Sequence, residues 1–404
     1  MLKQVEAIEL DEPFVDVLTE GGLHKVMVAF DWLGRLPVWF LAFVWLAVAA
    51  VVAVAWQVLG YNGRFSLWAG GLVALFTAVD AAILISLPRL QISFGRWQGQ
   101  WLPLAVPRVA AALAVGGIGL WLKPETAVLL HALIQFTALA AYIKGAVIEP
   151  TRLTMSEVVI FSDRLPIGTP PIKVLHISDI HVERLAKREA KLLELVAQAE
   201  ADVIAITGDY VNLSYNRDPE TLRQVRHLLS QLSAPYGVYA TLGSPPVDLR
   251  ETVVPVFNGL PVYLMRRDWT KLDLGNGRNL TIVGMDCTHY LPQDRAQLAQ
   301  LAAQVPDDAP QLFLYHSPEL MPEVAAHGID LYLCGHTHGG QVRLPLIGPL
   351  LTSSQLGRRY VMGLYRAGRT HLYVSRGVGL EGLSAPRVRF LAPPEITLFT
   401  IRGK

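Results

Sequence analysis

Four long apolar runs in the first 150 residues constrain the fold of this chain more than any other feature. A helix rises 1.5 Å per residue, so about 20 residues are needed to cross the hydrocarbon core of a bilayer. Each run is at least that long, and only short connectors separate the runs, which favours antiparallel neighbouring helices. We therefore predict a bundle of four transmembrane helices, at residues 36–61, 66–87, 101–122 and 126–148.

The composition divides the chain into a membrane part and a water-soluble part. Hydrophobic residues make up 52% of the 404 residues and charged residues only 17%, unlike an ordinary soluble enzyme. Nine of the eleven histidines follow residue 150. The net charge of +1 argues against a nucleic-acid partner, because phosphate backbones are bound by clustered Lys and Arg. We expect an N-terminal segment at 1–35, the helices at 36–148 and a second domain at 149–404.

Positive charges near the ends of the apolar runs predict how the chain crosses the membrane. Six Lys and Arg residues lie on one side and two on the other, and the richer side faces the cytoplasm. Both termini and the second domain are therefore expected in the cytoplasm. The acidic segment before the first run is a poor cleavable signal, so we expect that run to remain as an anchor. Within that segment, residues 13–34 are predicted as a membrane-surface helix or, equally, as an acidic tail.

Two charged residues inside the apolar runs are expected to form an ion pair. Asp80 and Arg108 fall at similar depths in neighbouring antiparallel helices, and a charge inside a bilayer needs a partner or a function. The alternative is a proton or solute pathway that also uses His131 and Gln135, which share a helix face. In that alternative, the helices form a small transporter that is gated by the second domain.

Beyond residue 149 the pattern changes to that of an α/β domain. Short β-branched runs alternate there with longer amphipathic stretches. A Gly275-Asn276-Gly277 turn joins two antiparallel strands within 261–286. The other expected strands are 172–177, 202–207, 237–242, 311–315 and 329–333, with three more in 360–402, and the expected helices are 183–200 and 218–232.

Polar side chains follow the ends of these strands in a pattern that indicates a metal site. Because ligand groups gather beyond the carboxyl ends of strands in open α/β sheets, we expect these side chains to converge. Two carboxylates and four imidazoles suit Mn, Fe or Zn ions better than Ca or Mg. Two such ions about 3.5–4 Å apart would activate a water molecule for attack on a phosphoryl group. The candidate metal ligands are Asp179, His181, Asp209, His316, His336 and His338.

The order of these motifs resembles the calcineurin-like metallophosphoesterase family over about residues 171–402. The likeness is closest to a branch of membrane-attached bacterial members whose last motif reads Gly-His-Thr-His-Gly-Gly-Gln, here residues 335–341. It implies a sandwich of two mixed sheets flanked by helices, in a protein of the bacterial inner membrane. By position, the resemblance implies that Asp179, His181 and His338 bind the first ion and that His316 and His336 bind the second. It implies that Asp209 bridges the two ions.

One family motif is altered in this sequence. The family has Gly-Asn-His after its third strand, whereas residues 243–246 here read Gly-Ser-Pro-Pro. Ser244 matches the Asn that binds the second ion, and Pro245 matches the His that contacts the phosphate and can protonate the leaving group. The loss of one general acid typically costs a factor of about 10²–10⁴ in rate. His289 and Asp248 are candidates for the missing catalytic role, or else ordinary loop residues.

Two functions are consistent with these residues. The first is a membrane-anchored metallophosphoesterase, a hydrolase that cleaves a phosphoester or pyrophosphate bond by two-metal activation of water. Only about thirty residues separate the last apolar run from Asp179, so a lipid phosphoester is considered as a substrate beside a soluble one. The second function is that of a degenerate member, which keeps a metal- or phosphate-binding cleft and acts as a sensor or membrane scaffold. The altered motif is the whole support for this second function.

Overall fold

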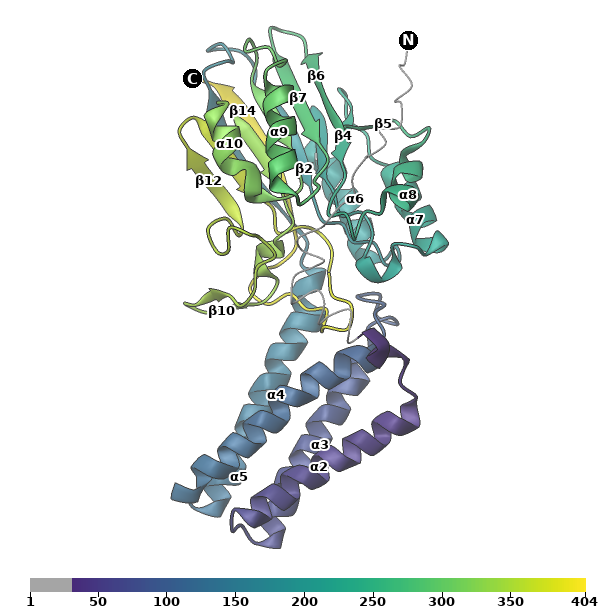
Figure 1. Ribbon diagram of the computed structural model, residues 1–404, viewed down its shortest axis with the longest axis vertical. Coiled ribbons are helices and arrows are strands. Elements are labelled where there is room, and N and C mark those ends of the chain that lie inside the picture. Colours follow the sequence, from purple (N-terminus) through teal and green to yellow (C-terminus); the bar gives the residue numbers. More distant parts are fainter. Residues whose placement is uncertain (1–30) are drawn as a thin grey trace.

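The protein is described by a computed structural model, which covers residues 31–404 (Figure 1). The predicted N-terminal segment lies largely outside the described residues, and so does the expectation of a surface helix or acidic tail at 13–34. Its last part, Asp31–Arg35, forms a short 3-10 helix. The described chain folds into a helical bundle followed by an α/β domain (Figure 1).

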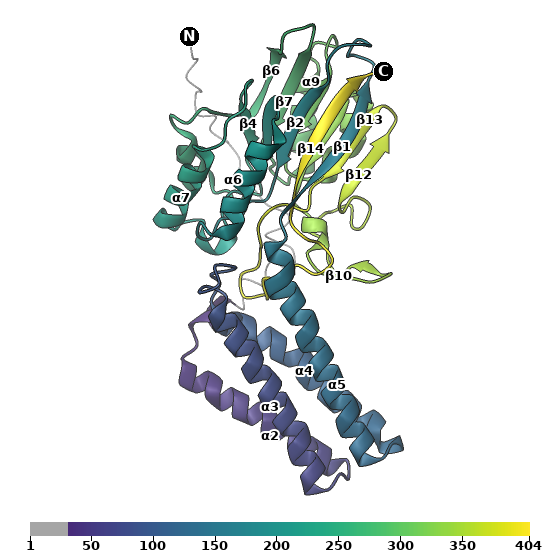
Figure 2. The same ribbon diagram turned by 180° about the vertical axis from the view of Figure 1, so that it is seen from behind.

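Four helices of the bundle are long and apolar enough to cross a membrane, as predicted. They pack side by side along their lengths (Figures 1 and 2). The Asn62 side chain begins the second of them by accepting a hydrogen bond from the Phe65 amide. Pro124 begins the fourth, at a position where a missing amide hydrogen is not needed. The helices are α2 (Val38–Val58), α3 (Gly63–Ser86), α4 (Trp97–Ile118) and α5 (Pro124–Ile143), and the π-helical turn η3 (Lys144–Ile148) extends α5.

The bundle confirms the predicted ion pair between Asp80 on α3 and Arg108 on α4. Both side chains are buried, and the Arg108 guanidinium donates to both carboxylate oxygens, with Nη2 2.7 Å from Oδ1. Gln135 on α5 joins the network, because its Oε1 accepts from Arg108 Nη1 at 3.0 Å and its amide donates to the Arg108 carbonyl at 2.9 Å. His131 lies apart from the pair, with Nε2 3.3 Å from the Ala69 carbonyl. The ion pair therefore connects three helices.

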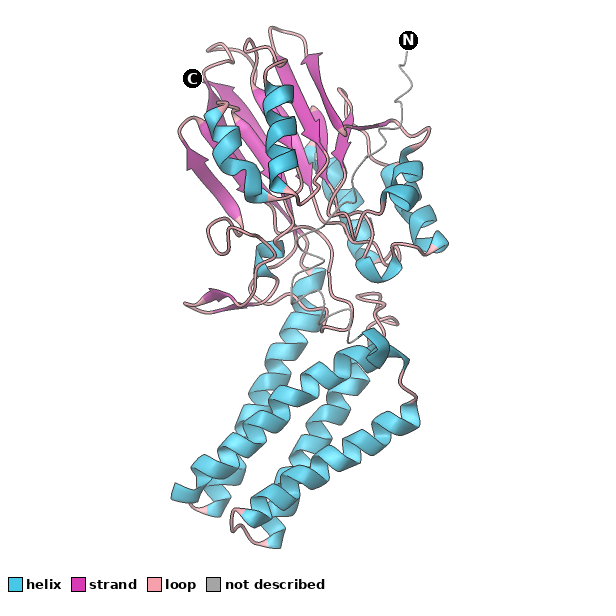
Figure 3. Ribbon diagram, viewed as in Figure 1, coloured by secondary structure: helices cyan, strands magenta, loops and turns pink. Residues whose placement is uncertain are grey.

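The α/β domain is a sandwich of two six-stranded mixed sheets with helices on the outer faces, as predicted (Figure 3). The first sheet has the order β1-β14-β2-β3-β4-β5, and the second has the order β12-β13-β9-β8-β7-β6. The strands of the first sheet are β1 (Thr154–Ser162), β14 (Glu395–Gly403), β2 (Ile172–Ile177), β3 (Val203–Thr207), β4 (Val238–Thr241) and β5 (Val262–Leu264). Those of the second are β12 (Gly363–Ala367), β13 (Thr370–Val374), β9 (Leu331–Cys334), β8 (Gln311–Leu314), β7 (Asn279–Met285) and β6 (Arg267–Asp273). The helices are α6 (Lys187–Ala199), α7 (Pro219–Leu229) and α8 (Arg250–Val253) beside the first sheet, and α9 (Leu291–Ala302) and α10 (Met321–Ala326) beside the second.

The alternation of side chains along the central strands produces the layers of the core. In β2, Val174 faces the other sheet, whereas Leu175 packs with the helices of the first sheet. In β8, Leu312 faces inward and Phe313 packs outward with residues of α9 and α10. Because both faces of these strands are covered, their sequences are continuous apolar runs, which is why the sequence predicts them.

Two features of the strand pairing are not evident in the sequence. β1 follows the helical bundle directly and pairs in parallel with β14, from Thr154 opposite Glu395 to Ser162 opposite Gly403. Its partner lies at the other end of the domain in sequence, so no local pattern indicates the pairing. A two-rung ladder also joins β10 (Arg343–Leu344) to β11 (Gly348–Pro349), and these strands are too short to show a periodic pattern.

The central parallel strands of the first sheet point their carboxyl ends toward the helical bundle. β2, β3 and β4 are parallel, and their carboxyl ends lie on the side of the domain nearest the helices (Figures 1 and 2). The connector between α3 and α4 contacts this side. Glu183, which follows β2, accepts from the Phe94 amide at 2.6 Å and pairs with Arg387 at 2.6 Å. The Arg387 amide in turn donates to Gln100 Oε1 of α4 at 3.1 Å, so a site at these strand ends lies close to the bundle.

Candidate metal centre

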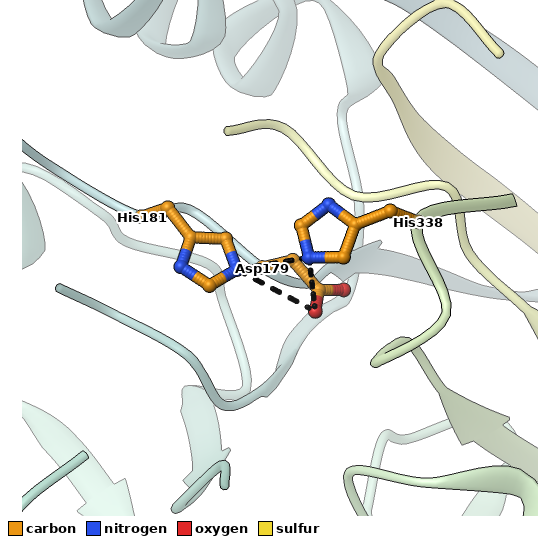
Figure 4. A group of neighbouring side chains, drawn as sticks. All are labelled: Asp179, His181 and His338. Atoms are coloured by element: carbon orange, nitrogen blue, oxygen red, sulfur yellow. Dashed lines mark hydrogen bonds and ion pairs between the residues drawn. The ribbon is translucent and has the colours of Figure 1, made fainter. Parts of the chain in front are cut away.

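Three of the predicted ligands form one cluster beyond the ends of β2 and β9. Asp179 and His181 follow β2, and His338 follows β9. Figure 4 shows both rings facing one carboxylate oxygen of Asp179, with Nε2 of His338 3.5 Å and Nε2 of His181 4.0 Å from Oδ1. The two ring nitrogens lie 2.9 Å apart, and all three side chains are buried. Their geometry is suitable for holding a metal ion.

A second cluster shares Asp179 and adds residues that follow two more strands. Asp209 follows β3 and His316 follows β8, and Nε2 of His316 lies 3.2 Å from Asp209 Oδ2. Ligand atoms of Asp179, Asp209 and His316 lie within 4.8 Å of one another, close enough to hold a metal ion. Asp209 Oδ2 is also 3.6 Å from Nε2 of His181. The Asp209 carboxylate therefore lies between the two clusters.

The sixth predicted ligand, His336, lies beside the second cluster but belongs to neither group. Its ring centroid is 5.1 Å from that of His316. Its Nε2 faces the Ser353 carbonyl at 3.2 Å, and its Nδ1 faces the Ser244 hydroxyl at 3.3 Å. Because Nε2–H donates to the carbonyl, the lone pair of Nδ1 points toward Ser244, the residue that replaces the Asn of the family motif.

Hydrogen bonds behind the rings determine which nitrogen faces the clusters. His181 Nδ1 lies 2.9 Å from Glu381 Oε2, and His316 Nδ1 lies 2.7 Å from the Thr207 carbonyl. Donation from Nδ1 leaves the Nε2 lone pair directed at the clusters, and partners of this kind strengthen metal binding by histidine. The sequence does not indicate the role of Glu381, because that residue acts through a tertiary contact with a distant ligand.

The donor set fits divalent metal ions. Nε2 of His181 and Nε2 of His338 face each other at 2.9 Å and share a proton in the metal-free protein, at a place where a cation could replace that proton. The buried Nε2 of His316 likewise faces the Asp209 carboxylate at 3.2 Å. A buried imidazole and carboxylate this close can share either a proton or a metal ion. Imidazoles and carboxylates together are the donors that Mn, Fe and Zn ions prefer.

Opposite charges in the centre shift the pKa values of the ligands. Burial alone would lower the pKa of His181, but the carboxylates of Glu381 and Asp209 raise it to about 9. Burial would also lower the pKa of His316, yet Asp209 raises it well above its usual value. Conversely, burial would raise the pKa of Asp209, but His316 and His181 hold it well below its usual range. In the metal-free protein, protons on the histidine rings therefore balance the negative charge of the carboxylates, as metal cations would.

A fully buried arginine lies behind the last ligand. Arg389 Nη2 is 2.9 Å from His338 Nδ1, and the guanidinium also donates to the carbonyls of Gly379, Arg376 and His338. Burial, and then the charge of Arg389, lower the pKa of His338 well below its usual value. This ring is therefore neutral. Because Arg389 donates to Nδ1, the ring proton lies on Nε2 in the metal-free protein, and that proton would have to leave for Nε2 to bind a metal ion. Arg389 is a second residue of the site that the sequence analysis missed.

Five of the six predicted ligands adopt left-handed backbone conformations. Such conformations cost about 1–3 kcal/mol each for residues other than glycine, and they are typical of functional sites. Space around the ligands is also tight, because a Cβ atom on Gly335 would lie 1.9 Å from Asp179 Oδ2. The φ angles are 49° at Asp179, 45° at His181, 56° at Asp209, 71° at His336 and 52° at His338.

Asp248, a candidate for the missing catalytic role, connects the two loops next to the altered motif. Its carboxylate is fully buried and accepts from the amides of Asp209, Tyr210 and Gly243 at 2.8–2.9 Å. Burial, and then the charge of Asp209, raise the pKa of Asp248 to about 7. Since its oxygens face backbone amides, Asp248 is placed to hold the loops after β3 and β4 together.

Ser244 and His289 both lie beside His336. The Ser244 amide donates to Asp209 Oδ1 at 2.7 Å, and the Ser244 hydroxyl faces His336. The ring centroids of His289 and His336 are 5.0 Å apart. His289 follows β7 and has a φ of 60°, so it shares the backbone strain of the ligands. The fold thus brings this second candidate to the edge of the metal centre.

Comparison with known proteins identifies relatives of this chain. A profile of the calcineurin-like phosphoesterases matches residues 172–340, which include all six predicted ligands. The uncharacterised metallophosphoesterase YkuE of Bacillus subtilis is 31% identical over 277 residues, which cover 66% of this chain and 92% of YkuE. The phosphodiesterase YaeI of Escherichia coli K12 is 27% identical over 235 residues, which cover 57% of this chain and 82% of YaeI.

Solved structures also resemble part of this chain. A dimetal phosphatase from Danio rerio has a TM-score of 0.35 and 14% identity, and the overlap covers 52% of this chain and 88% of that one. The match to YkuE is the more extensive, since it covers nearly all of that protein. The chain therefore belongs to the calcineurin-like metallophosphoesterase family.

Proposed function

We propose that this protein is a membrane-anchored, metal-dependent phosphoesterase whose active site lies in the bacterial cytoplasm. The observation that carries the proposal is the pair of buried Asp/His clusters that share Asp179. Family membership supports a hydrolase of phosphoesters. Four apolar helices of sufficient length precede the site, so we assign residues 36–148 as the anchor in the inner membrane and 149–404 as the hydrolase domain.

We assign the six predicted ligands to two divalent metal ions. When bound, these ions lower the pKa of a water molecule and neutralise charge on the phosphoryl group. Behind the ligands, Glu381 and the Thr207 carbonyl hold two rings in the tautomer that binds metal. Asp179, His181 and His338 would hold the first ion, and His316 and His336, with Ser244 beside them, would hold the second. Asp209 would serve both ions.

The altered motif determines the kind of ester that we expect. Pro245 stands where the family has a proton donor, and proline has no proton to give. We assign part of this role to His289, because its ring lies 5.0 Å from that of His336. Esters with an acidic leaving group need the least protonation. Pyrophosphates and activated phosphodiesters are therefore the expected substrates.

A phospholipid or a lipid pyrophosphate fits the place of the site. The strand ends that carry the ligands face the helical bundle (Figures 1 and 2). Glu183, two residues after His181, contacts the connector between α3 and α4. Lipid phosphates lie in the headgroup layer, next to the hydrocarbon core that the helices would span. A soluble phosphoester is the alternative substrate.

A second candidate function is metal or phosphate binding without turnover, in a sensor or a membrane scaffold. The altered motif favours it, because Ser244 offers a hydroxyl in place of an amide carbonyl and Pro245 lacks a proton. The residues of both Asp/His clusters nevertheless lie close together in the fold. Retention of all six predicted ligands favours an enzyme over a sensor or scaffold.

Metal content is the first test of the proposal. The protein is purified without affinity-metal resin, and elemental analysis is compared between the parent, Asp209→Ala and Asp308→Ala, whose carboxylate is exposed and distant from the site. We expect two transition-metal ions per chain, both lost in Asp209→Ala, because Asp209 lies 3.6 Å and 3.2 Å from a histidine of each cluster. One ion or none in the parent would favour the second candidate.

Turnover is the second test, with bis(4-nitrophenyl) phosphate as a soluble probe. We expect hydrolysis that a chelator abolishes and that Asp209→Ala lacks. The double change Ser244→Asn with Pro245→His then distinguishes the two candidates. A large gain in hydrolysis would indicate a disabled site in the parent, whereas no change or a loss would indicate that the altered loop has its own role in catalysis.

A further inference from the structure

The hairpin formed by β10 and β11 carries apolar side chains that contact little of the rest of the domain. We call residues 342–351 the leucine hairpin. Leu346, between the two strands, has a relative exposure of 108%, and Ile347 beside it has 59%. Soluble proteins rarely leave contiguous apolar groups exposed unless they mark an interaction surface. The exposed apolar side chains are Leu344, Leu346, Ile347, Leu350 and Leu351.

The base of the leucine hairpin contacts the end of the fourth long helix through one residue. Val342 pairs with Phe390, and the Arg343 amide donates to the Phe390 carbonyl at 2.9 Å. The Lys144 ammonium lies 4.8 Å from the centroid of the Phe390 ring, and the Arg389 amide donates to the Gly145 carbonyl at 2.9 Å. Lys144 and Gly145 belong to η3, at the domain-proximal end of α5. Figures 1 and 2 accordingly show β10 projecting sideways beside that end of the bundle.

The charges around the leucine hairpin complement a lipid surface. Residues 341–360 contain no Asp or Glu, but they include Arg343 at the base of the hairpin and the exposed Arg358 and Arg359 after it. Anionic headgroups attract such cations, while leucine side chains at the tip can enter the acyl boundary. An apolar tip above a cationic base is the arrangement that a segment at a membrane interface requires.

We propose that the leucine hairpin inserts its apolar tip into the headgroup–acyl boundary of the membrane that the four helices cross. The inference rests on the proposed function, because it needs the helices to span that membrane. The lipid surface is favoured over a second copy of the chain, because Phe390, which pairs with the hairpin base, also contacts Lys144 at the domain-proximal end of α5. Insertion would bury the leucines that the isolated chain leaves in water.

The leucine hairpin is also connected to the metal centre at both of its ends. Before it, the Arg343 guanidinium donates to the Gly339 carbonyl at 2.9 Å, in the loop that carries His336 and His338. After it, the Ser353 hydroxyl donates to the His336 carbonyl at 2.9 Å, and the Ser353 carbonyl accepts from His336 Nε2 at 3.2 Å. Contact with the bilayer would therefore fix the loop that carries two ligands at headgroup height, where lipid phosphoesters are available to the centre.

Insertion is tested by the depth of a fluorescent label in the full chain. Leu346→Cys is labelled with nitrobenzoxadiazole in lipid nanodiscs that hold one chain each, since Cys287 and Cys334 are buried. Ile167→Cys is the matched control, because Ile167 is apolar, 83% exposed and follows β1 at the end of the sheet remote from the bundle. We expect blue-shifted emission from the Leu346 label and quenching by doxyl-labelled phospholipid. The Ile167 label should be quenched by iodide in the water instead.

Two outcomes of the label experiment would overturn the inference. Equal quenching of both labels by iodide would place the leucine hairpin in water. A blue shift that appears only in nanodiscs with two chains would make the hairpin an interface between copies. Failure of the parent to enter nanodiscs would instead overturn the membrane anchor, and hence the proposed function.

A second variant tests the consequence for the substrate. Leu346→Asp with Ile347→Asp is expected to lower the ratio of turnover on a phosphoester in anionic vesicles to turnover on bis(4-nitrophenyl) phosphate by about tenfold or more, because apolar burial at the tip is lost. Ile167→Asp is expected to leave that ratio unchanged. An unchanged ratio in the hairpin variant would contradict a role in presenting lipid substrates. If the parent hydrolyses neither ester, the proposed function fails, whereas the label result stands.

Discussion

Glu381 contributes no atom to either Asp/His cluster, yet its carboxylate lies 2.9 Å from His181 Nδ1 and directs the opposite ring nitrogen toward Asp179. The same principle applies to the Thr207 carbonyl behind His316 and to Ser353 behind His336. Each of these three rings is thus oriented by a residue from another segment of the chain.

Glu381→Gln is expected to weaken metal affinity by about 10–100-fold, a typical cost for a partner behind a metal-bound histidine. Gln retains an acceptor for His181 Nδ1 but lacks the charge that stabilises a metal-bound imidazole. The measurement is a metal titration of chelator-treated protein. Glu251→Gln is the matched control, because Glu251 is exposed and pairs with Arg217. Equal affinities of the two variants would contradict the role of Glu381.

The metal-free protein is expected to lose stability as the pH rises from about 6.5 to 9. The pKa of His181 is raised to about 9 by Glu381 and Asp209, so its stabilising charge is fully present below the unfolded pKa of about 6.5. That contribution is lost as the pH rises through the folded value. Thermal melting of chelator-treated protein across this range measures the effect, and Glu381→Gln should flatten it. A melting temperature that rises with pH would contradict the assignment.

The sequence predicts which side chains gather at the strand ends, because each follows a buried strand and short spacing places Asp179 with His181 and His336 with His338. Their binding of metal ions stays a prediction. The sequence does not predict Glu381 or Arg389, since both lie in the long segment between β13 and β14, which has no regular structure. Their roles depend on how that segment folds against the centre. Nothing in its local pattern gives this information.

At the scale of elements, the apolar helices and the strands with two covered faces are the parts that sequence periodicity predicts. The edge strand β1 differs, because Val159 and Phe161 are half exposed on it and its register comes only from β14. Sequence periodicity likewise does not predict the short β10–β11 ladder. The sequence shows that its leucines are apolar. It does not predict their exposure, because that depends on where the base of the hairpin contacts the rest of the domain.

Asp80→Asn is expected to destabilise the helical bundle without emptying the metal centre. The change leaves the buried Arg108 without a charged partner, and removal of one member of a buried ion pair typically costs about 3–5 kcal/mol. Thermal stability in membranes or detergent and metal content per chain measure the two effects. Glu125→Gln, at the exposed start of α5, is the control. Loss of a transport signal in a variant of unchanged stability would instead support the transporter alternative.

At the scale of the whole molecule, the orientation in the membrane decides which compartment the metal centre serves. Six positive residues against two near the ends of the apolar runs predict a cytoplasmic domain. A green fluorescent protein fused after Lys404 is therefore expected to fluoresce, and alkaline phosphatase fused there is expected to be inactive. The opposite pair of results would place the domain outside the cytoplasm.

The order of the first sheet has a consequence for how the protein is made. β14 lies between β1 and β2, although it consists of residues 395–403. A ribosome therefore completes the four apolar helices, β1 and β2 long before it releases the strand that joins the two. Until then, β1 and β2 each carry an unpaired edge toward the missing strand, and such edges readily pair with other chains. Synthesis thus includes an interval in which the nascent domain, already attached to its helices, cannot close its first sheet.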